Sequence, residues 1–276
     1  MIQNNLISPP QLPKATCTGC GGCSNICPKD AIFLEPDAEG FQHPVIQTAL
    51  CINCKKCEQI CPVLHWENPN QDTNPPCYTV RAKDVIRERS SSGGVFTLAA
   101  RAIFKKRGVV VGAAFDRNQH LSLKISKSEL GIARMRGSKY VQSVIGDSYK
   151  EVKEFLKQGR SVLFSGTPCQ IEGLRAFLRK DYENLYLVDI VCHGVPSPKV
   201  SRKYIEWHES KRKSKIKYMS YREKTYGATS TTLTFNFENG KKYSHGYESD
   251  FLLKSFLNGL ISRPSCYECK FKTIER

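Results

Sequence analysis

Eight of the thirteen cysteines of this 276-residue chain fall into two copies of one spacing. Each copy has three cysteines separated by two residues and then a Cys-Pro pair after three more. The copies are Cys17-x-x-Cys20-x-x-Cys23-x-x-x-Cys27-Pro28 and Cys51-x-x-Cys54-x-x-Cys57-x-x-x-Cys61-Pro62. Three thiolates at this spacing on a tight loop can point inward at three corners of one iron–sulfur cube, so the repeat predicts cluster chemistry.

The bacterial two-cluster ferredoxins have this cysteine run, and in them the fourth cysteine of a run ligates the other cluster. We therefore expect two [4Fe–4S] clusters, with the ligand sets Cys17, Cys20, Cys23, Cys61 and Cys51, Cys54, Cys57, Cys27. Two alternatives are disfavoured. Zinc sites use C-x2-C pairs in fours, and a disulfide framework needs an oxidising compartment.

Length, composition and charge narrow the class of protein. The 40% of hydrophobic residues can form a sizeable core in one or two domains. Residues 1–14 lack a basic start and an apolar stretch, and the longest apolar run, Val109 to Phe115, is far shorter than the ~18 residues of a membrane span. We expect a soluble, cytoplasmic protein with no signal peptide and no membrane span.

The formal net charge of +16 indicates an anionic partner. Two cubane clusters with their thiolates would lower it to about +12. The densest basic run, residues 211–217, is either a nucleic-acid patch or the solvated C-terminal end of a helix. Because no recognition module with interspersed aromatic residues accompanies it, nucleic acid is disfavoured and docking to an acidic redox partner is favoured.

The pattern beyond the cysteine repeat predicts an α/β domain. Strands are expected near residues 78–82, 108–115, 161–165 and 185–191, and helices from the 90–94 loop to about 106, over 147–158, and from 168 to about 179. The last strand–helix–strand stretch is a βαβ unit, which favours a mostly parallel sheet. Further on, we expect helices over 199–213 and 251–260 and a hairpin of 231–237 with 241–247 around Asn239-Gly240.

The predicted fold class is therefore mixed, α+β with α/β: a dicluster ferredoxin module followed by a mostly parallel α/β domain with an added hairpin and helices. The expected division is residues 1–66 for the ferredoxin module, 67–77 for a linker, 78–199 for the α/β domain and 200–276 for a basic α+β segment. Cys77, at the start of a predicted strand, is expected in the core.

A second chemical centre is expected at the carboxyl ends of the strands, where ligands of open α/β sheets bind. The segments Gly166-Thr167-Pro168-Cys169 and Cys192-His193-Gly194 both occupy this position. With Cys266 and Cys269 they provide four further thiols, which suit a third [4Fe–4S] cluster or a structural zinc, or are simply buried residues without metal. Loops 90–94 and 137–140, rich in Ser and Gly, are candidates for holding a phosphate.

Four ordered motifs resemble the coenzyme F420 hydrogenase/dehydrogenase beta-subunit family. They are Ser91-Ser92-Gly93-Gly94-Val95-Phe96, Gly137-Ser138-Lys139-Tyr140-Val141-Gln142-Ser143, Gly166-Thr167-Pro168-Cys169-Gln170 and Cys192-His193-Gly194-Val195-Pro196-Ser197. The resemblance implies an oxidoreductase with FAD in the α/β domain, near a cubane cluster. It places Ser91, Ser92, Gly93, Gly94, Gly137, Ser138, Lys139, Tyr140 and Thr167 at the FAD, and Cys169, Cys192, Cys266 and Cys269 at the adjacent cluster.

The family implies hydride exchange between the flavin and a small molecule, coenzyme F420 or another, with single electrons passing through clusters to a redox partner protein or ferredoxin. Lys139 is either a balance for the charge of pyrophosphate or reduced flavin or a solvated surface lysine, and His193 is either a proton carrier or a partner in a structural hydrogen bond. Family members usually continue into an Asp/Gly-rich segment with a Gly-Asp-Phe-Trp-Gly-like motif, which this chain, ending at Arg276, lacks. We therefore expect a fragment or a shortened protein.

Three other functions are considered. One is a ferredoxin-like carrier or docking subunit without an active site of its own, which the missing segment favours. Another is a thiol-based reductase with Cys169 as its nucleophile. The last and least favoured is nucleic-acid binding.

Overall fold

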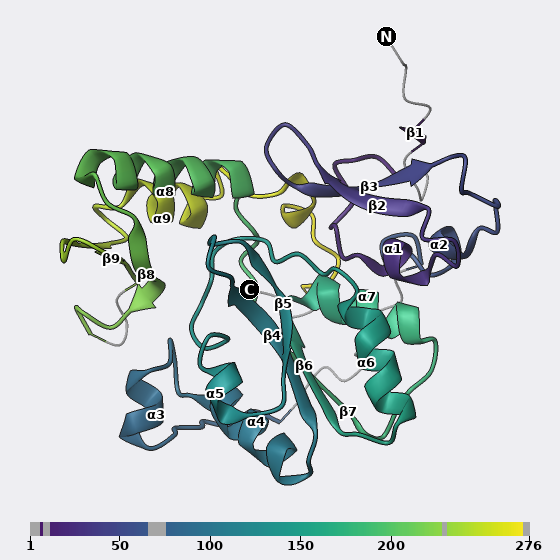
Figure 1. The fold of residues 1–276 in the computed structure, drawn as a ribbon, viewed down its shortest axis with the longest axis horizontal. Coiled ribbons are helices and arrows are strands. Elements are labelled where there is room, and N and C mark those ends of the chain that lie inside the picture. Colours follow the sequence, from purple (N-terminus) through teal and green to yellow (C-terminus); the bar gives the residue numbers. More distant parts are fainter. Residues whose placement is uncertain (1–5, 8–11, 66–75, 228–230, 273–276) are drawn as a thin grey trace.

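A computed structural model describes residues 6–7, 12–65, 76–227 and 231–272 of the chain. Figure 1 shows three parts: the N-terminal ferredoxin module in purple, a central sheet flanked by helices in teal, and a C-terminal sheet with two helices in green and yellow. The predicted linker at 67–77 lies mostly outside the described residues. Among the described residues no helix is long and apolar enough to cross a membrane.

The two halves of the ferredoxin module share a backbone conformation as well as a cysteine spacing. It contains β1 (Leu6–Ile7), α1 (Gly22–Ile26), β2 (Ile32–Pro36), β3 (Gln42–Gln47) and α2 (Lys56–Gln59), with β1 and β2 both antiparallel to β3. Before each short helix two residues adopt positive φ, Gly19 and Gly21 in the first copy (66° and 74°) and Asn53 and Lys55 in the second (53° and 59°). The matching turns wrap each cysteine triple in the same way.

The central domain is a three-layer α/β/α arrangement. Its elements are α3 (Asp84–Glu88), α4 (Val95–Lys105), β4 (Val109–Phe115), β5 (Leu121–Ser126), α5 (Glu129–Ile132), α6 (Ser148–Lys157), β6 (Val162–Gly166), α7 (Pro168–Leu178) and β7 (Leu185–Asp189). The sheet has the order β5-β4-β6-β7, in which β4, β6 and β7 are parallel and β5 is antiparallel.

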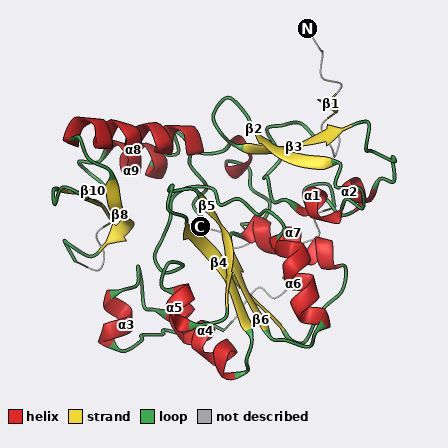
Figure 2. Cartoon of the chain, in the orientation of Figure 1, coloured by secondary structure: helices red, strands yellow, loops and turns green. Residues whose placement is uncertain are grey.

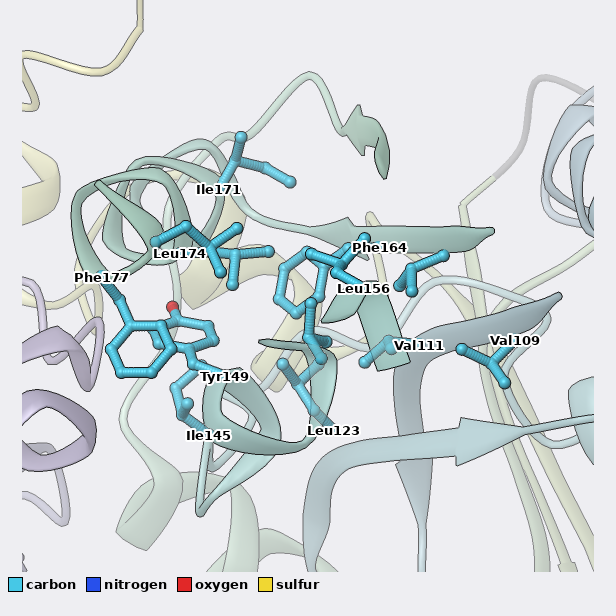
Figure 3. Close-up of a cluster of buried hydrophobic side chains, with 13 residues drawn as sticks. Val109, Val111, Leu123, Ile145, Tyr149, Leu156, Phe164, Ile171, Leu174 and Phe177 are labelled. Atoms are coloured by element: carbon cyan, nitrogen blue, oxygen red, sulfur yellow. The ribbon is translucent and has the colours of Figure 1, made fainter. Parts of the chain in front are cut away.

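The two faces of this sheet carry separate cores because side chains alternate along a strand. Val109 and Val111 of β4 face α6 and α7, where they join the cluster drawn in Figure 3 around Tyr149, Phe164 and Leu174. Val110 faces the other way, into a second cluster with residues of α4 and α5. These helices fix the carboxyl ends of β6 and β7, where two of the cysteine motifs begin.

The C-terminal part is an antiparallel sheet covered by helices. It consists of α8 (Pro198–Arg212), β8 (Ile216–Glu223), β9 (Thr232–Phe237), β10 (Lys242–Gly246), α9 (Phe251–Leu257) and the 3-10 turn η1 (Pro264–Cys266), with the strand order β10-β9-β8. Helices α8 and α9 run side by side in Figure 2. Phe115, Tyr140 and Val141 of the central domain pack into its core.

The mixed α/β class with a parallel sheet is confirmed, as are the helix after the 90–94 loop and the Asn239-Gly240 hairpin. The predicted strand at 78–82 is wrong: this segment belongs to no strand, and Tyr78 is 82% exposed. For the same reason Cys77 is exposed and does not lie in the core. Strands β5 and β8 were not predicted.

The basic run 211–217 lies at the C-terminal end of α8 and the start of β8. Lys211 lies over the ring of Trp207 at 4.9 Å, and Lys215 forms an ion pair with Glu209 at 2.6 Å. Lysines that close a helix C-terminus in this way match the solvated-end interpretation.

Candidate functional site

The first cysteine set lines one cavity. Cys17, Cys20, Cys23 and Cys61 line one cavity that opens to solvent. Burial raises the pKa of the Cys23 thiol well above its usual range, and the neighbouring thiols Cys20, Cys17 and Cys61 raise it further. The structure therefore brings the fourth cysteine of the second run to the triple of the first.

These residues fit a cluster bound by thiolates. Burial raises the pKa of the Cys20 thiol to about 12, so its thiolate needs a positive ion beside it. Helix α7 approaches this thiol closely because Gly173 has no side chain: a Cβ there would lie 3.1 Å from the Cys20 Sγ. The glycine therefore lets α7 pack directly against the first cysteine set.

The second set, Cys27, Cys51, Cys54 and Cys57, lies nearer the surface. Cys51 and Cys54 are exposed, whereas Cys61 of the first set is buried. Backbone N–H groups donate to two of its sulfurs, from Ala31 to Cys27 Sγ at 3.3 Å and from Asn53 to Cys51 Sγ at 3.4 Å. Burial raises the pKa of Cys57, and nearby Glu58 and Cys54 contribute. This set forms the outward side of the module.

The third set is assembled from separate parts of the chain. Cys169 lies in the first turn of α7, and Cys192 follows β7. Cys266 is the last residue of η1, and Cys269 follows three residues later. Burial raises the pKa of Cys169, to which the thiols Cys20, Cys192 and Cys269 contribute, and that of Cys192, to which Cys266 and Cys269 contribute. The four predicted thiols therefore lie near enough to affect one another's pKa, and Cys20 of the first set affects that of Cys169.

Two side chains hold this arrangement. The Tyr149 hydroxyl, on α6, lies 2.7 Å from the Cys20 carbonyl oxygen and 2.8 Å from that of Gln170 in α7. Lys272 Nζ donates to the carbonyl oxygens of His193 at 3.1 Å and Cys266 at 3.0 Å. Tyr149 thus links the first set to α7, and Lys272 links the late C-x-x-C to the loop after β7.

The described residues contain no group of three or more His, Cys, Asp or Glu side chains close enough to hold a single metal ion.

The two Ser/Gly loops lie side by side. The backbone N–H of Ser138 donates to Ser91 Oγ at 2.8 Å. Gly94, the residue before α4, has a φ of 90°, and a Cβ on Gly93 would lie 2.4 Å from the Val80 carbonyl oxygen. Both positions therefore require glycine.

Arginines surround these loops, a feature that the sequence reasoning missed except for Arg87 and Arg89 just upstream. The Nε atoms of Arg101, Arg136 and Arg222 are buried without a hydrogen-bond partner in the described part of the chain. Burial lowers the pKa of Arg136, and nearby Arg101 and Arg89 lower it further. Buried guanidinium Nε atoms without a partner suit an anionic ligand.

Other predicted residues have different surroundings. All three donors of Lys139 are used by backbone carbonyls, of Met135 (2.9 Å), Arg136 (2.8 Å) and Gly137 (3.1 Å), and burial lowers its pKa to about 8. Thr167 caps α7, and its Oγ1 lies 3.2 Å from Cys169 Sγ. Lys139 therefore braces its loop, and Thr167 belongs to the surroundings of the third set.

Tyr140 and His193 are connected through one ring. The Phe256 ring lies 5.0 Å from that of Tyr140 and 5.2 Å from that of His193, between centroids. His193 is exposed and directly follows Cys192. The Gly137 loop and the third cysteine set are thus joined by a short aromatic contact chain.

Comparisons with known families agree with this geometry. Residues 16–64 match the family described as "4Fe-4S dicluster domain", which defines an iron–sulfur protein of the ferredoxin type. Residues 159–276 match the family of the C-terminal part of the coenzyme F420 hydrogenase/dehydrogenase beta subunit. The chain is thus similar to this beta-subunit family over residues 159–276 and to the dicluster domain over residues 16–64. The loops 91–94 and 137–140 lie outside both matched ranges.

A search of curated proteins gives no match. Among solved structures, the chain is similar to one chain of the F420-reducing [NiFe] hydrogenase complex from Methanosarcina barkeri, with 18% identity and a TM-score of 0.47. The match covers 70% of this chain and 66% of that one.

Proposed function

We propose that this chain is an iron–sulfur flavoprotein that passes electrons between a hydride-exchanging FAD and a redox partner protein. The observation that carries the proposal is the Tyr149 hydroxyl, which lies 2.7 Å from the Cys20 carbonyl oxygen and 2.8 Å from that of Gln170. This contact sets α7, with Cys169 at its start, against the ferredoxin module. When bound, [4Fe–4S] clusters would supply one-electron transfer and FAD would supply hydride exchange. The small molecule that exchanges hydride is F420 or another compound.

The chain's own residues arrange the three sets in a series. The second set has exposed cysteines and faces outward, the first is more buried, and the third begins with Cys169 at the start of α7. A redox partner protein would therefore meet the molecule at the second set. We assign the third set to a [4Fe–4S] cluster because its donors are four thiols, the ligand type that such clusters use.

The loops 91–94 and 137–140 would hold the anionic part of FAD. The Ser138–Ser91 hydrogen bond joins them, and Arg136 and Arg222 have buried, unpartnered Nε atoms there. A pyrophosphate would accept charge-assisted hydrogen bonds from these guanidinium groups. Such a ligand removes the cost of leaving the arginine Nε donors unsatisfied.

The aromatic contacts extend this pocket toward the third set. Tyr140 leaves the Gly137 loop, and its ring reaches His193 through Phe256. A flavin ring held along this path would have the exposed His193 at its side as a candidate proton carrier.

The test is to measure iron and released flavin per chain on protein purified under strict anaerobiosis. The proposal predicts about twelve irons and one FAD, which is three cubanes and one flavin. About eight irons without flavin would contradict it and favour the second candidate, a ferredoxin-like electron carrier. That candidate has one observation in its favour, since the flavin loops lie outside the matched family ranges.

A further inference from the structure

Arg263 is one of the largest fully buried side chains, with 1% of its surface exposed. All its described hydrogen bonds go to neutral groups. Nε donates to the Cys17 carbonyl oxygen at 2.8 Å, Nη1 to Gln142 Oε1 at 2.8 Å, and Nη2 to the Gln42 carbonyl oxygen at 2.9 Å. No carboxylate of the described residues forms an ion pair with it. A buried charge without a counter-ion is costly, so its balancing charge has to come from elsewhere.

The remaining neighbours of the guanidinium do not supply that charge. Nη2 lies 3.3 Å from the His43 ring nitrogens, and the guanidinium lies 5.4 Å from the centre of the Phe41 ring. Burial lowers the pKa of His43, and Arg263 lowers it further, so this imidazole is neutral at pH 7. The Asp37 carboxylate contacts His43 at 3.1 Å and is thus linked to Arg263 only through the His43 ring.

Arg263 lies between the first and third cysteine sets. Its Nε contacts the backbone of Cys17 in the first, and its own carbonyl oxygen accepts from the Cys266 N–H in the third at 2.9 Å. The loop of the first set is shaped around it: Gly19 has a φ of 66°, and a Cβ there would lie 3.1 Å from Nη1. Gln142 completes this contact by donating from Nε2 to the Thr18 carbonyl oxygen at 3.0 Å.

We propose that Arg263 is a positioning residue whose fixed charge favours the reduced state of the clusters held by the first and third sets. This inference rests on the proposed function, in which both sets hold [4Fe–4S] clusters. A cubane with four thiolates carries about −2 when oxidised and about −3 after it accepts one electron. The attraction to a nearby cation grows with the added electron, so Arg263 raises the reduction potential. In the proposed function this electron passes from one cluster to the other.

The experiment is a redox titration monitored by electron paramagnetic resonance on the full chain with its clusters bound. It compares wild type, Arg263→Gln, Arg263→Lys and the control Arg160→Gln. Arg160 is suitable because it also donates to backbone carbonyls, of Arg107 and Gly108, and contacts no cysteine set. Arg263→Gln should lower the reduced-to-oxidised ratio at a fixed potential about tenfold, which is about 59 mV for one electron.

Arg263→Lys keeps the charge and should stay near the wild-type potential, as should Arg160→Gln. The inference is overturned if Arg263→Gln holds its clusters and titrates like wild type, or if Arg263→Lys shifts as far as Arg263→Gln. The second result would assign the effect to packing and hydrogen bonds rather than to charge.

If Arg263→Gln loses its clusters, Gln142→Glu replaces it in the redox titration. This change keeps the guanidinium and places a carboxylate where Gln142 Oε1 now accepts at 2.8 Å. It should lower the potential in the same direction, and an unchanged or raised potential would overturn the inference. Iron per chain in the wild type is measured first. Fewer than about twelve irons per chain would count against the proposed function. A reduction potential that does not change when the charge at Arg263 is removed would count against the role of Arg263 alone.

Discussion

The ferredoxin module and the rest of the chain assemble their cysteine sets in opposite ways. In the module, three ligands of each set come from one short loop, and only Cys27 and Cys61 are exchanged between loops. The third set draws on the start of α7, the loop after β7 and the segment at η1, up to 100 residues apart from Cys169 to Cys269. Local loops can place ligands with little help from the fold, whereas the third set exists only when the whole sheet is formed.

The same two regions differ in charge. Residues 1–66 contain four Lys and no Arg against five Asp and Glu, while the rest of the chain contains 38 basic and 21 acidic residues. An acidic partner attracted by the overall charge would thus be steered by the α/β and C-terminal parts rather than by the ferredoxin module.

The largest expected effect separates the two kinds of ligand set. Cys169→Ala should remove about four of about twelve irons and leave the two ferredoxin clusters, because none of the ferredoxin ligands comes from α7. Iron and sulfide analysis of the purified variant measures this. Cys77→Ala is the matched control and should keep all the iron, since Cys77 is exposed and outside the three sets. Loss of all clusters in Cys169→Ala would show that the sets are not independent.

Acid should destabilise the C-terminal part, which carries Cys266 and Cys269, more than the module. Burial lowers the pKa of His208 to about 4, and nearby Arg212 contributes. An unfolded histidine titrates at about 6.5, so between pH 6.5 and 4 the unfolded state binds a proton that the folded state does not. The free energy of unfolding should therefore fall by up to about 3 kcal/mol over this window.

Trp207 reports this change because its ring lies 4.7 Å from that of His208. Urea unfolding of the cluster-free chain, followed by tryptophan fluorescence, should show the acid-dependent loss in wild type and a smaller one in His208→Phe. An equal pH dependence in both would contradict the assignment to His208.

Tyr149→Phe tests the hydrogen-bond contact between the ferredoxin module and the central α/β domain. It removes the hydroxyl that lies between the Cys20 and Gln170 carbonyl oxygens and leaves both without that partner. The expected loss is about 1–3 kcal/mol in the free energy of unfolding, measured by denaturant titration. Tyr182→Phe, on the partly buried edge of the same core, is the control. A loss no greater than in the control would contradict this role of the hydroxyl.

The smallest effect concerns the flavin loops, which are also assembled from distant segments. Arg136→Gln should weaken FAD binding about tenfold, equivalent to about 1.4 kcal/mol, through loss of a charge-assisted hydrogen bond. Fluorescence titration with FAD measures this, with Arg160→Gln as the control. Unchanged affinity would place the pyrophosphate elsewhere.

The sequence predicted the module well because its information is local: cysteine spacing, glycines and Cys-Pro pairs lie within one loop. The same holds for α6, α7 and the Asn239-Gly240 hairpin, whose start and stop residues are adjacent to them. The four thiols of the third set were predicted as candidates, but their approach to Cys20 depends on how α7 packs against α1.

Other features could not be predicted because they depend on tertiary contacts. Strand β5 pairs with β4 although its sequence has only a short alternating pattern. The segment at 78–82 has strand-forming residues but no partner strand. Arg263 looked like one more basic residue, since burial and neutral neighbours leave no sign in the sequence.

The central claim is that a third cluster is bound beside the ferredoxin module by Cys169, Cys192, Cys266 and Cys269. An anomalous difference map at the iron edge, from crystals grown anaerobically, tests it most directly. The account predicts three separate iron peaks, with the third enclosed by these four sulfurs and next to the peak at Cys20. Two peaks confined to the ferredoxin module, or a third at other residues, would contradict it.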